Sequence, residues 1–141
     1  MIRDIFENAY AAGAYSLAGV ALMAISFIVL DLLTPGRLRE HLWAERNRNA
    51  GILVSSNLAG IAIIVTAAIV ASEGRLVEGL VYTAVYTAIG IAVTAATFAL
   101  IDVATPGRLG ELLLRPEPHP AVWVQSVAHV GVALIVASAI L

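Results

Sequence analysis

Three polar side chains, Asn57, Gln125 and His129, lie in long stretches of the sequence that carry no charged residue. Gln125 precedes His129 by one helical turn, which would place both side chains on one face of a helix. An imidazole changes its protonation state near neutral pH, so one interpretation is a proton-sensitive or ligand-sensing site. The other is interhelical hydrogen bonding, worth about 0.6–2 kcal/mol per bond in membrane bundles. We favour hydrogen bonding, because His129 is the one ionisable group expected at this depth and has no evident charged partner.

A second group of candidate residues belongs to a motif that occurs twice in the chain. In each copy an aspartate precedes Thr-Pro-Gly-Arg-Leu, and the residues are Asp31, Thr34, Pro35, Gly36 and Arg37, then Asp102, Thr105, Pro106, Gly107 and Arg108. The two aspartates would be proton or cation sites if they lay at the mouth of a path through a membrane. In the alternative, each carboxylate accepts hydrogen bonds from the following backbone or pairs with Arg37 or Arg108. We favour this structural role, because a charge at a membrane interface costs little.

The same motif predicts a sharp corner after a long helix. Proline cannot continue a helix, and Thr34 and Thr105 are suited to be N-caps, with Pro35 and Pro106 at the first position of a new short helix. Leucines and polar residues then alternate at helical spacing in both copies. This pattern is typical of an amphipathic segment that lies on a membrane surface.

The elements that must position these residues are four transmembrane helices. Of the 141 residues, 60% are hydrophobic and only 13% are charged, and the mean hydropathy is +0.92. Asp, Glu, Lys and Arg are absent from four windows, residues 8–30, 49–72, 79–101 and 118–141. About 20 apolar residues in a helix cross the roughly 30 Å of a bilayer's hydrocarbon core, so each window is long enough. We therefore predict an all-α membrane protein.

The chain is also a tandem repeat. Sliding the sequence on itself by 71 positions pairs residues 1–70 with 72–141 and gives 22 identities without a gap. The predicted units are repeat 1, residues 1–71, with helices over 8–33 and 49–71, and repeat 2, residues 72–141, with helices over 79–104 and 120–141. Because each repeat crosses the membrane twice, the copies run parallel, and we expect a pseudo-two-fold axis along the membrane normal. Together they form one membrane domain.

Arginine placement predicts the orientation, because the chain contains no lysine. Six of the eight arginines lie between the two helices of a repeat, namely Arg37, Arg39, Arg46, Arg48, Arg108 and Arg115. The positive-inside rule then places both intra-repeat loops, with their amphipathic corners, in the cytoplasm. Both termini and the turn over residues 72–78 are expected outside. The predicted location is a bacterial plasma (inner) membrane, in which the chain is multi-pass.

Small residues indicate where helices approach one another. Alanine recurs every fourth residue at Ala84, Ala88, Ala92 and Ala96, and Ser56 and Gly60 form a small-xxx-small pair. Such spacing lets membrane helices pack closely. The alanine stripe is interpreted as either an intramolecular contact or a face for self-association.

Enzyme chemistry finds little support in the sequence. The chain has no cysteine, and His41, His119 and His129 lack the spacing of metal ligands or of an HExxH motif. Glycine-rich phosphate loops are absent, and a net charge of −2 argues against nucleic-acid binding. We therefore predict no enzymatic activity, no cofactor and no metal site.

The two-helix unit with an Asp and a Pro-containing corner, followed by "NRNAGILVSSNLAG" with Asn47 and Gly60 as the best matches, resembles a bacterial inner-membrane family. This family is domain of unknown function 350, also called the UPF0719 transmembrane proteins. The similarity covers the whole chain, and it implies a membrane protein without implying an activity. In the second repeat the position of Asn47 is occupied by Pro118.

Two functional interpretations follow. In the first, the protein is a membrane-embedded structural or interaction subunit that organises partners or responds to envelope stress. Its partners would be the lipid bilayer and either a second copy of itself or another membrane protein, with no nucleic acid. In the second, it is a small channel or transporter with a path at an oligomer interface. The shortage of charged residues within the membrane favours the first.

Overall fold

The computed structural model of the chain describes residues 2–72 and 75–141, and in this part of the chain all regular structure is helical. The helices are α1 (Ile2–Leu33), α2 (Leu38–Trp43), α3 (Arg48–Ala71), α4 (Leu76–Ala104), α5 (Leu109–Leu113) and α6 (Ala121–Ile140). The four long ones, α1, α3, α4 and α6, are long and apolar enough to cross a membrane. The prediction of an all-α protein with four candidate spans is confirmed. Residues 73 and 74 of the predicted outer turn lie outside the described residues.

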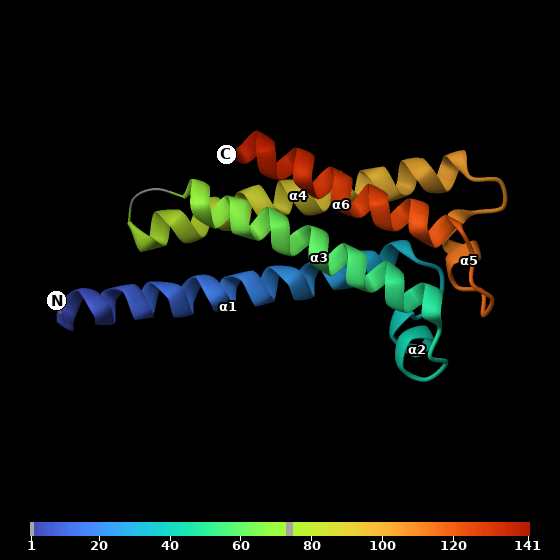
Figure 1. Cartoon of the computed structure of the whole chain (residues 1–141), viewed down its shortest axis with the longest axis horizontal. Coiled ribbons are helices and arrows are strands. Elements are labelled where there is room, and N and C mark those ends of the chain that lie inside the picture. The colour runs from blue at the N-terminus through green and yellow to red at the C-terminus, as the bar shows by residue number, and fades with distance from the viewer. Residues whose placement is uncertain (1, 73–74) are drawn as a thin grey trace.

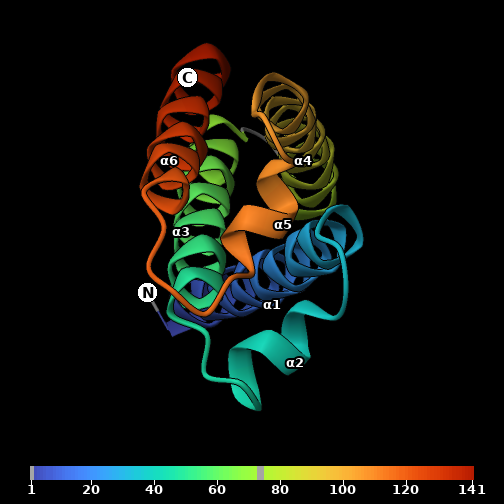
Figure 2. The same cartoon turned by 90° about the vertical axis from the view of Figure 1, so that its right-hand side faces the viewer.

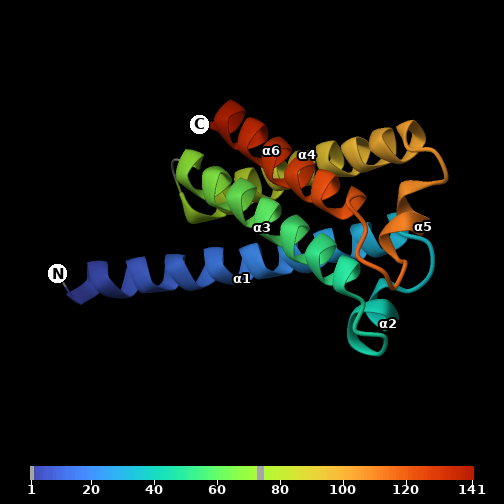
Figure 3. The ribbon, with the colours of Figure 1, turned by 45° about the vertical axis from the view of Figure 1, so that its right-hand side comes forward.

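These four segments have long stretches without charged residues, which suits them to a bilayer, and the bilayer in turn favours a helix. In a bilayer every backbone N–H and C=O must be bonded within the segment, and an α-helix achieves this without a neighbour. The four long helices form a bundle, with α2 and α5 at one end and the two chain termini at the other (Figure 1). Residues 3–10 of α1 are exposed. The amino-terminal part of α1 runs apart from the other helices (Figure 3).

Helix α3 is the centre of the bundle. It packs against α1, α4 and α6, and half of its apolar span is buried, compared with 22–33% for the other three spans. The end-on view shows α6, α4 and α1 around it (Figure 2). The most extensive packing is between α3 and α6, where a Cβ at Gly60 would lie 3.0 Å from the carbonyl oxygen of His129. The small-xxx-small pair therefore marks a contact inside the chain.

The packing departs from the two-fold symmetry that the repeat predicts. Two-fold related copies would pack α1 on α6 as closely as α4 packs on α3, but α1 and α6 make no comparable contact. Both Gly19 of α1 and Gly90 of α4 face α3 instead, at the neighbouring residues Val65 and Ile64. Gly131, which corresponds to Gly60, is in open space, because a Cβ added there would meet nothing within 4 Å. One helix, α3, thus supplies much of the core of the bundle.

The alanine stripe on α4 faces outward. Ala84, Ala88, Ala92 and Ala96 are all exposed, whereas the opposite face of α4 buries Thr83, Thr87, Gly90, Ile91 and Phe98. Of the two interpretations of this stripe, the intramolecular contact is wrong, because α4 packs on α3 through its other face, where Gly90 meets Ile64.

Candidate functional site

His129 lies in the interior of the bundle with both ring nitrogens hydrogen-bonded. Its side chain comes from α6 and is 2% exposed. Nδ1 lies 3.0 Å from the hydroxyl of Ser56 on α3, and Nε2 lies 2.9 Å from the amide nitrogen of Gln125, one turn earlier on α6. The imidazole therefore connects the two helices that pack most extensively.

The hydrogen-bond directions in this network assign one imidazole tautomer. The Ser56 hydroxyl donates to the carbonyl oxygen of Leu53 at 2.9 Å, so its proton is already used. His129 Nδ1–H must then donate to Ser56 Oγ, and Nε2 accepts from the Gln125 amide. Every donor and acceptor of a neutral imidazole is satisfied in this arrangement. The amide oxygen of Gln125 is buried without a partner among the described residues.

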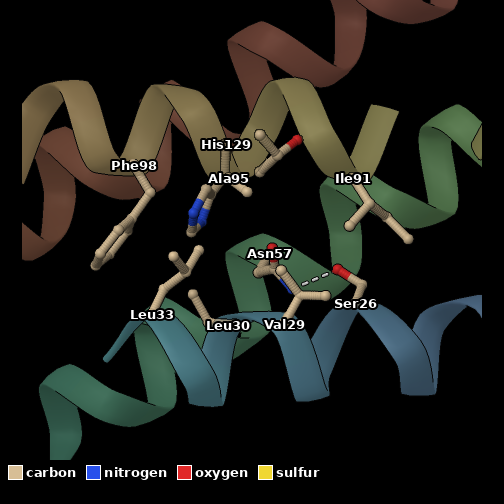
Figure 4. A pocket seen from close by; sticks show the side chains of 10 residues that line it. Ser26, Val29, Leu30, Leu33, Asn57, Ile91, Ala95, Phe98 and His129 are labelled. Atoms are coloured by element: carbon tan, nitrogen blue, oxygen red, sulfur yellow. Dashed lines mark hydrogen bonds between the residues drawn. The ribbon is translucent and has the colours of Figure 1, made fainter. Parts of the chain in front are cut away.

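Asn57 connects α3 to α1. Its amide nitrogen donates to Ser26 Oγ at 3.0 Å, and both side chains are buried. Asn57 and His129 line the same small cavity, together with Ser26, Thr94 and apolar side chains that include Phe98 (Figure 4). We call this the polar cavity. Its volume is about 10 Å³, which is close to the space that one water molecule needs.

The structure brings the three predicted mid-membrane residues together. Asn57 and His129 face one cavity, and Gln125 bonds to His129. The interhelical hydrogen bonds expected of them are present at Ser26 and Ser56. No group of three or more His, Cys, Asp or Glu residues that would hold a metal occurs in the described part of the chain. The cavity has polar groups for one water molecule and no paired acid and base.

Two further buried polar groups were missed at the sequence level. The hydroxyls of Thr83 and Thr87, one turn apart on α4, are fully buried and have no hydrogen-bond partner among residues 2–72 and 75–141. Along α4, Gly90 packs against Ile64 of α3 and lies between these threonines and Ile91, which lines the polar cavity. The four-residue spacing of these threonines can be read from the sequence. It does not indicate a site, because threonine is common in membrane helices, where it normally bonds its own backbone.

The two aspartates of the repeated motif accept hydrogen bonds from the backbone that follows them. Asp31 Oδ1 accepts from the N–H of Leu38 at 2.8 Å, and Asp102 Oδ1 accepts from the N–H of Gly110 at 3.0 Å. This is the first of the two structural alternatives. The second, a pair with arginine, is not found in the described residues, because Arg37 pairs with Glu40 at 3.1 Å.

The prediction that Thr34 and Thr105 are N-caps is wrong. Both hydroxyls donate backwards, to the carbonyl oxygens of Leu30 and Ile101, at the ends of α1 and α4. The short helices begin later, at Leu38 and Leu109, with Arg37 and Arg108 as their N-cap residues. Pro35 and Pro106 consequently precede those helices and do not start them.

Glycines make the reversal that the prolines were expected to make. Gly36 and Gly107 have φ angles of +85° and +91°, in the left-handed region that residues with a side chain rarely adopt. Each follows the proline and turns the chain from the long helix to the short one. The glycine therefore supplies the backbone conformation that the corner needs.

A further polar cluster at the start of α3 ties this helix to the loop before α6. Asn47 caps α3 by accepting from the N–H of Ala50 at 3.2 Å, and it donates to the carbonyl oxygen of Leu114 at 2.8 Å. Asn49 donates to the carbonyl oxygens of Arg115 and Glu117. The sequence pointed to Asn47 only through the family resemblance, and it did not point to Asn49 at all. An Asn before a long apolar run is an N-cap signal, but its partners lie far away in the sequence.

Comparison with known proteins gives one family. Domain of unknown function 350 matches residues 4–140. A UPF0719 transmembrane protein of Mycobacterium bovis is 35% identical over 139 residues, which are 99% of this chain and 91% of that protein. One of Mycobacterium tuberculosis has the same identity and coverage, and one of Mycolicibacterium paratuberculosis is 27% identical over 99% of this chain and 92% of its own. No solved structure matches the chain at a significant level.

Proposed function

The chain belongs to the domain of unknown function 350 family, a family with transmembrane members, and from this premise we propose that it is a membrane-embedded structural or interaction subunit. In this role it has no enzymatic activity and needs no cofactor. It would organise partners in the membrane or respond to envelope stress. The family itself carries no assigned activity, so the proposal rests on how the polar side chains are used.

The observation that carries the proposal is that buried polar groups near the middle of the spans connect helices to one another. Asn57 bonds to Ser26, and His129 bonds to Ser56, so α1, α3 and α6 are joined by side-chain hydrogen bonds. The polar cavity between them has room for about one water molecule. An apolar layer that includes Ile64 and Ile91 packs along α3 and α4 on one side of it. Such an interior supports a rigid scaffold better than a path for solutes.

We infer that the chain consists of two parallel repeats, residues 1–71 and 72–141, whose corners lie on the cytoplasmic surface of the plasma membrane. Six of the eight arginines belong to the two intra-repeat loops, and α2 and α5 lie at one end of the bundle (Figure 1). The termini would then face outward. Single cysteines in place of Arg39 and Arg75 test this directly, because the chain has no native cysteine. An impermeant maleimide should label position 75 in intact cells and position 39 only after the cells are opened.

Self-association is the form of partnership that we propose first. The exposed alanines of α4, from Ala84 to Ala96, present a smooth face on which a second helix would pack closely. A cysteine at Ala88 should then crosslink between copies in membranes, whereas a cysteine at Leu100, an exposed residue toward the end of the same helix, should not. Another membrane protein on this face would give a crosslinked product of different mass.

A flux assay separates a subunit from a channel. Purified protein in liposomes should conduct protons, cations and small solutes no faster than liposomes without protein. His129→Gln should fold as the wild type does, and together with Ala88→Cys it should still crosslink, because an amide preserves hydrogen bonding. Flux that His129→Gln abolishes would replace this proposal with a channel whose path includes the polar cavity.

A further inference from the structure

A groove beside α2 has an apolar part and a polar part that adjoin. The apolar part has a volume of about 690 Å³, and Phe27 of α1 and Leu58 of α3 help to form it. The polar part has a volume of about 560 Å³ and includes Arg37 and Glu40. The two parts share Asp31, Arg39 and Trp43. We call the whole feature the α2 groove, and each part falls within the roughly 300–1,000 Å³ of small-molecule sites.

The α2 groove arises because α2 stands away from the bundle. It lies outside α1 and α3 in the end-on view, and only Leu38 is buried among its residues (Figure 2). Arg39 and Trp43 are one turn apart on α2, so both side chains border the same hollow. Trp43 is 75% exposed, as expected of an indole at a membrane interface.

The polar part contains one cation and one anion whose hydrogen-bonding capacity is not fully occupied. Arg37 pairs with Glu40 at 3.1 Å, whereas Arg39 has no carboxylate partner in residues 2–72 and 75–141. Asp31 accepts the Leu38 N–H through Oδ1, and its Oδ2 makes no hydrogen bond within the same residues. A guanidinium fits phosphate, and a carboxylate oxygen fits an ammonium group with N–H donors. The polar part therefore offers complementary groups for a ligand that carries both charges.

We propose that the α2 groove binds a zwitterionic phospholipid with a primary amine in its headgroup. The lipid phosphate contacts Arg39, the ammonium group contacts Asp31, and an acyl chain lies along the apolar part beside Phe27 and Leu58. Charge balance selects this lipid over an anionic one, because Asp31 and Glu40 offset Arg37 and Arg39. The three N–H donors of a primary ammonium select it over a quaternary amine, which has none.

The second corner lacks this site and serves as an internal control. Gly110 stands where the first corner has Arg39, and Leu114 stands where it has Trp43. The pocket there has a volume of about 230 Å³ and lies between the two corners, beside Pro35, Asp102 and Arg108. This volume is below the roughly 300–1,000 Å³ of small-molecule sites.

The test measures which lipid the full-length chain retains. Detergent-solubilised protein is incubated with equal amounts of phosphatidylethanolamine, phosphatidylglycerol and phosphatidylcholine of identical acyl chains, and bound lipid is measured by native mass spectrometry. We expect phosphatidylethanolamine to dominate. Arg39→Gln should reduce its retention about tenfold, the size expected for one charge-assisted hydrogen bond. Arg108→Gln, at the corner without the groove, should leave retention unchanged.

A second variant separates the two headgroup contacts. Asp31→Asn keeps an acceptor for the Leu38 N–H but removes the charge, so it should abolish the preference for phosphatidylethanolamine over phosphatidylcholine while phospholipid binding persists. Circular dichroism checks that each variant remains helical. Preferential retention of phosphatidylglycerol, equal retention of all three lipids, or full retention by Arg39→Gln would each overturn the proposal.

Discussion

The two corner segments, residues 31–43 and 102–114, make similar turns that differ at the arginine, where φ is −105° at Arg37 and +59° at Arg108, and their short helices take up different positions. Both use an aspartate that accepts from the backbone, a threonine that bonds backwards and a glycine with positive φ. After the turn, α5 packs inside the end of the bundle, where Leu109 and Leu113 are buried, whereas α2 lies outside it (Figure 2). The shared aspartate, threonine and glycine thus have similar roles in both corners, whereas the short helices that follow occupy different places.

One pair of equivalent residues explains the different positions of the two short helices: Arg39 in the first corner and Gly110 in the second. A Cβ at Gly110 would lie 2.6 Å from Cδ of Pro35, so only glycine lets α5 approach the first corner this closely. Arg39 occupies the equivalent position in α2 and is exposed. Two copies of one short motif therefore lie differently: α5 packs into the end of the bundle, and α2 stays largely exposed.

The largest expected effect is at this contact. Gly110→Ala places a methyl group against the Pro35 ring, which cannot rotate away, so we expect a loss of about 2–3 kcal/mol in the free energy of unfolding in detergent. Gly131→Ala is the control, because nothing lies within 4 Å of its added Cβ. Equal stability of the two variants would mean that α5 does not depend on a close approach to Pro35.

Removing the aspartates should cost nearly the same in both corners. Asp31→Ala leaves the N–H of the buried Leu38 without an acceptor, and Asp102→Ala does the same to Gly110. We expect a loss of about 2 kcal/mol for each in thermal or denaturant unfolding. The Asn variants keep an acceptor and should lose less. A large loss at only one site would show that only that corner depends on its aspartate.

The corner glycines should differ slightly. Gly36→Ala and Gly107→Ala each force alanine into a left-handed conformation, at about 1 kcal/mol. Gly36→Ala should be the more costly, since its Cβ would also lie 3.1 Å from Nε2 of His41, while that of Gly107 meets nothing. The reverse order in unfolding measurements would contradict this ranking.

The threonines should matter least. Thr34→Val and Thr105→Val remove a hydroxyl that bonds a carbonyl oxygen at the end of the preceding helix, and at Leu30 that oxygen also accepts from the N–H of Thr34. We expect a loss of under about 0.5 kcal/mol, compared with about 0.5–2 kcal/mol for the loss of an N-cap. A loss of about 0.5–2 kcal/mol would instead support the N-cap role that the sequence predicted.

The spans could be predicted from the sequence because their signal is local. The charge-free windows differ from the observed helices mainly at the ends, where α1 begins at Ile2 and α4 at Leu76. The grouping of Asn57 and His129 was also accessible, since depth in a membrane follows from position along a helix. The two residues indeed line one cavity.

What could not be predicted depends on which helices are neighbours. Self-matching of the sequence suggested a symmetric pair of repeats, yet α3 alone supplies much of the core of the bundle. The partners of Asn49 lie in the loop before α6, nearly 70 residues away, and no local pattern indicates them. The corner prolines suggested a helix start, but the following glycines delay it by their positive φ. In each case a contact between distant residues or a backbone conformation decided the structure, and the local preference of the residue type did not.

The central position of α3 has a consequence for how the protein is made. The helix that it packs against most, α6, begins only at Ala121, so during synthesis α3 enters the bilayer before the helix that covers it. Until α6 arrives, the Ser56 hydroxyl faces lipid without its imidazole partner and the surface at Gly60 is uncovered. An unfinished chain therefore exposes a polar, small-residue face within the membrane, which a membrane chaperone or protease can distinguish from the completed protein.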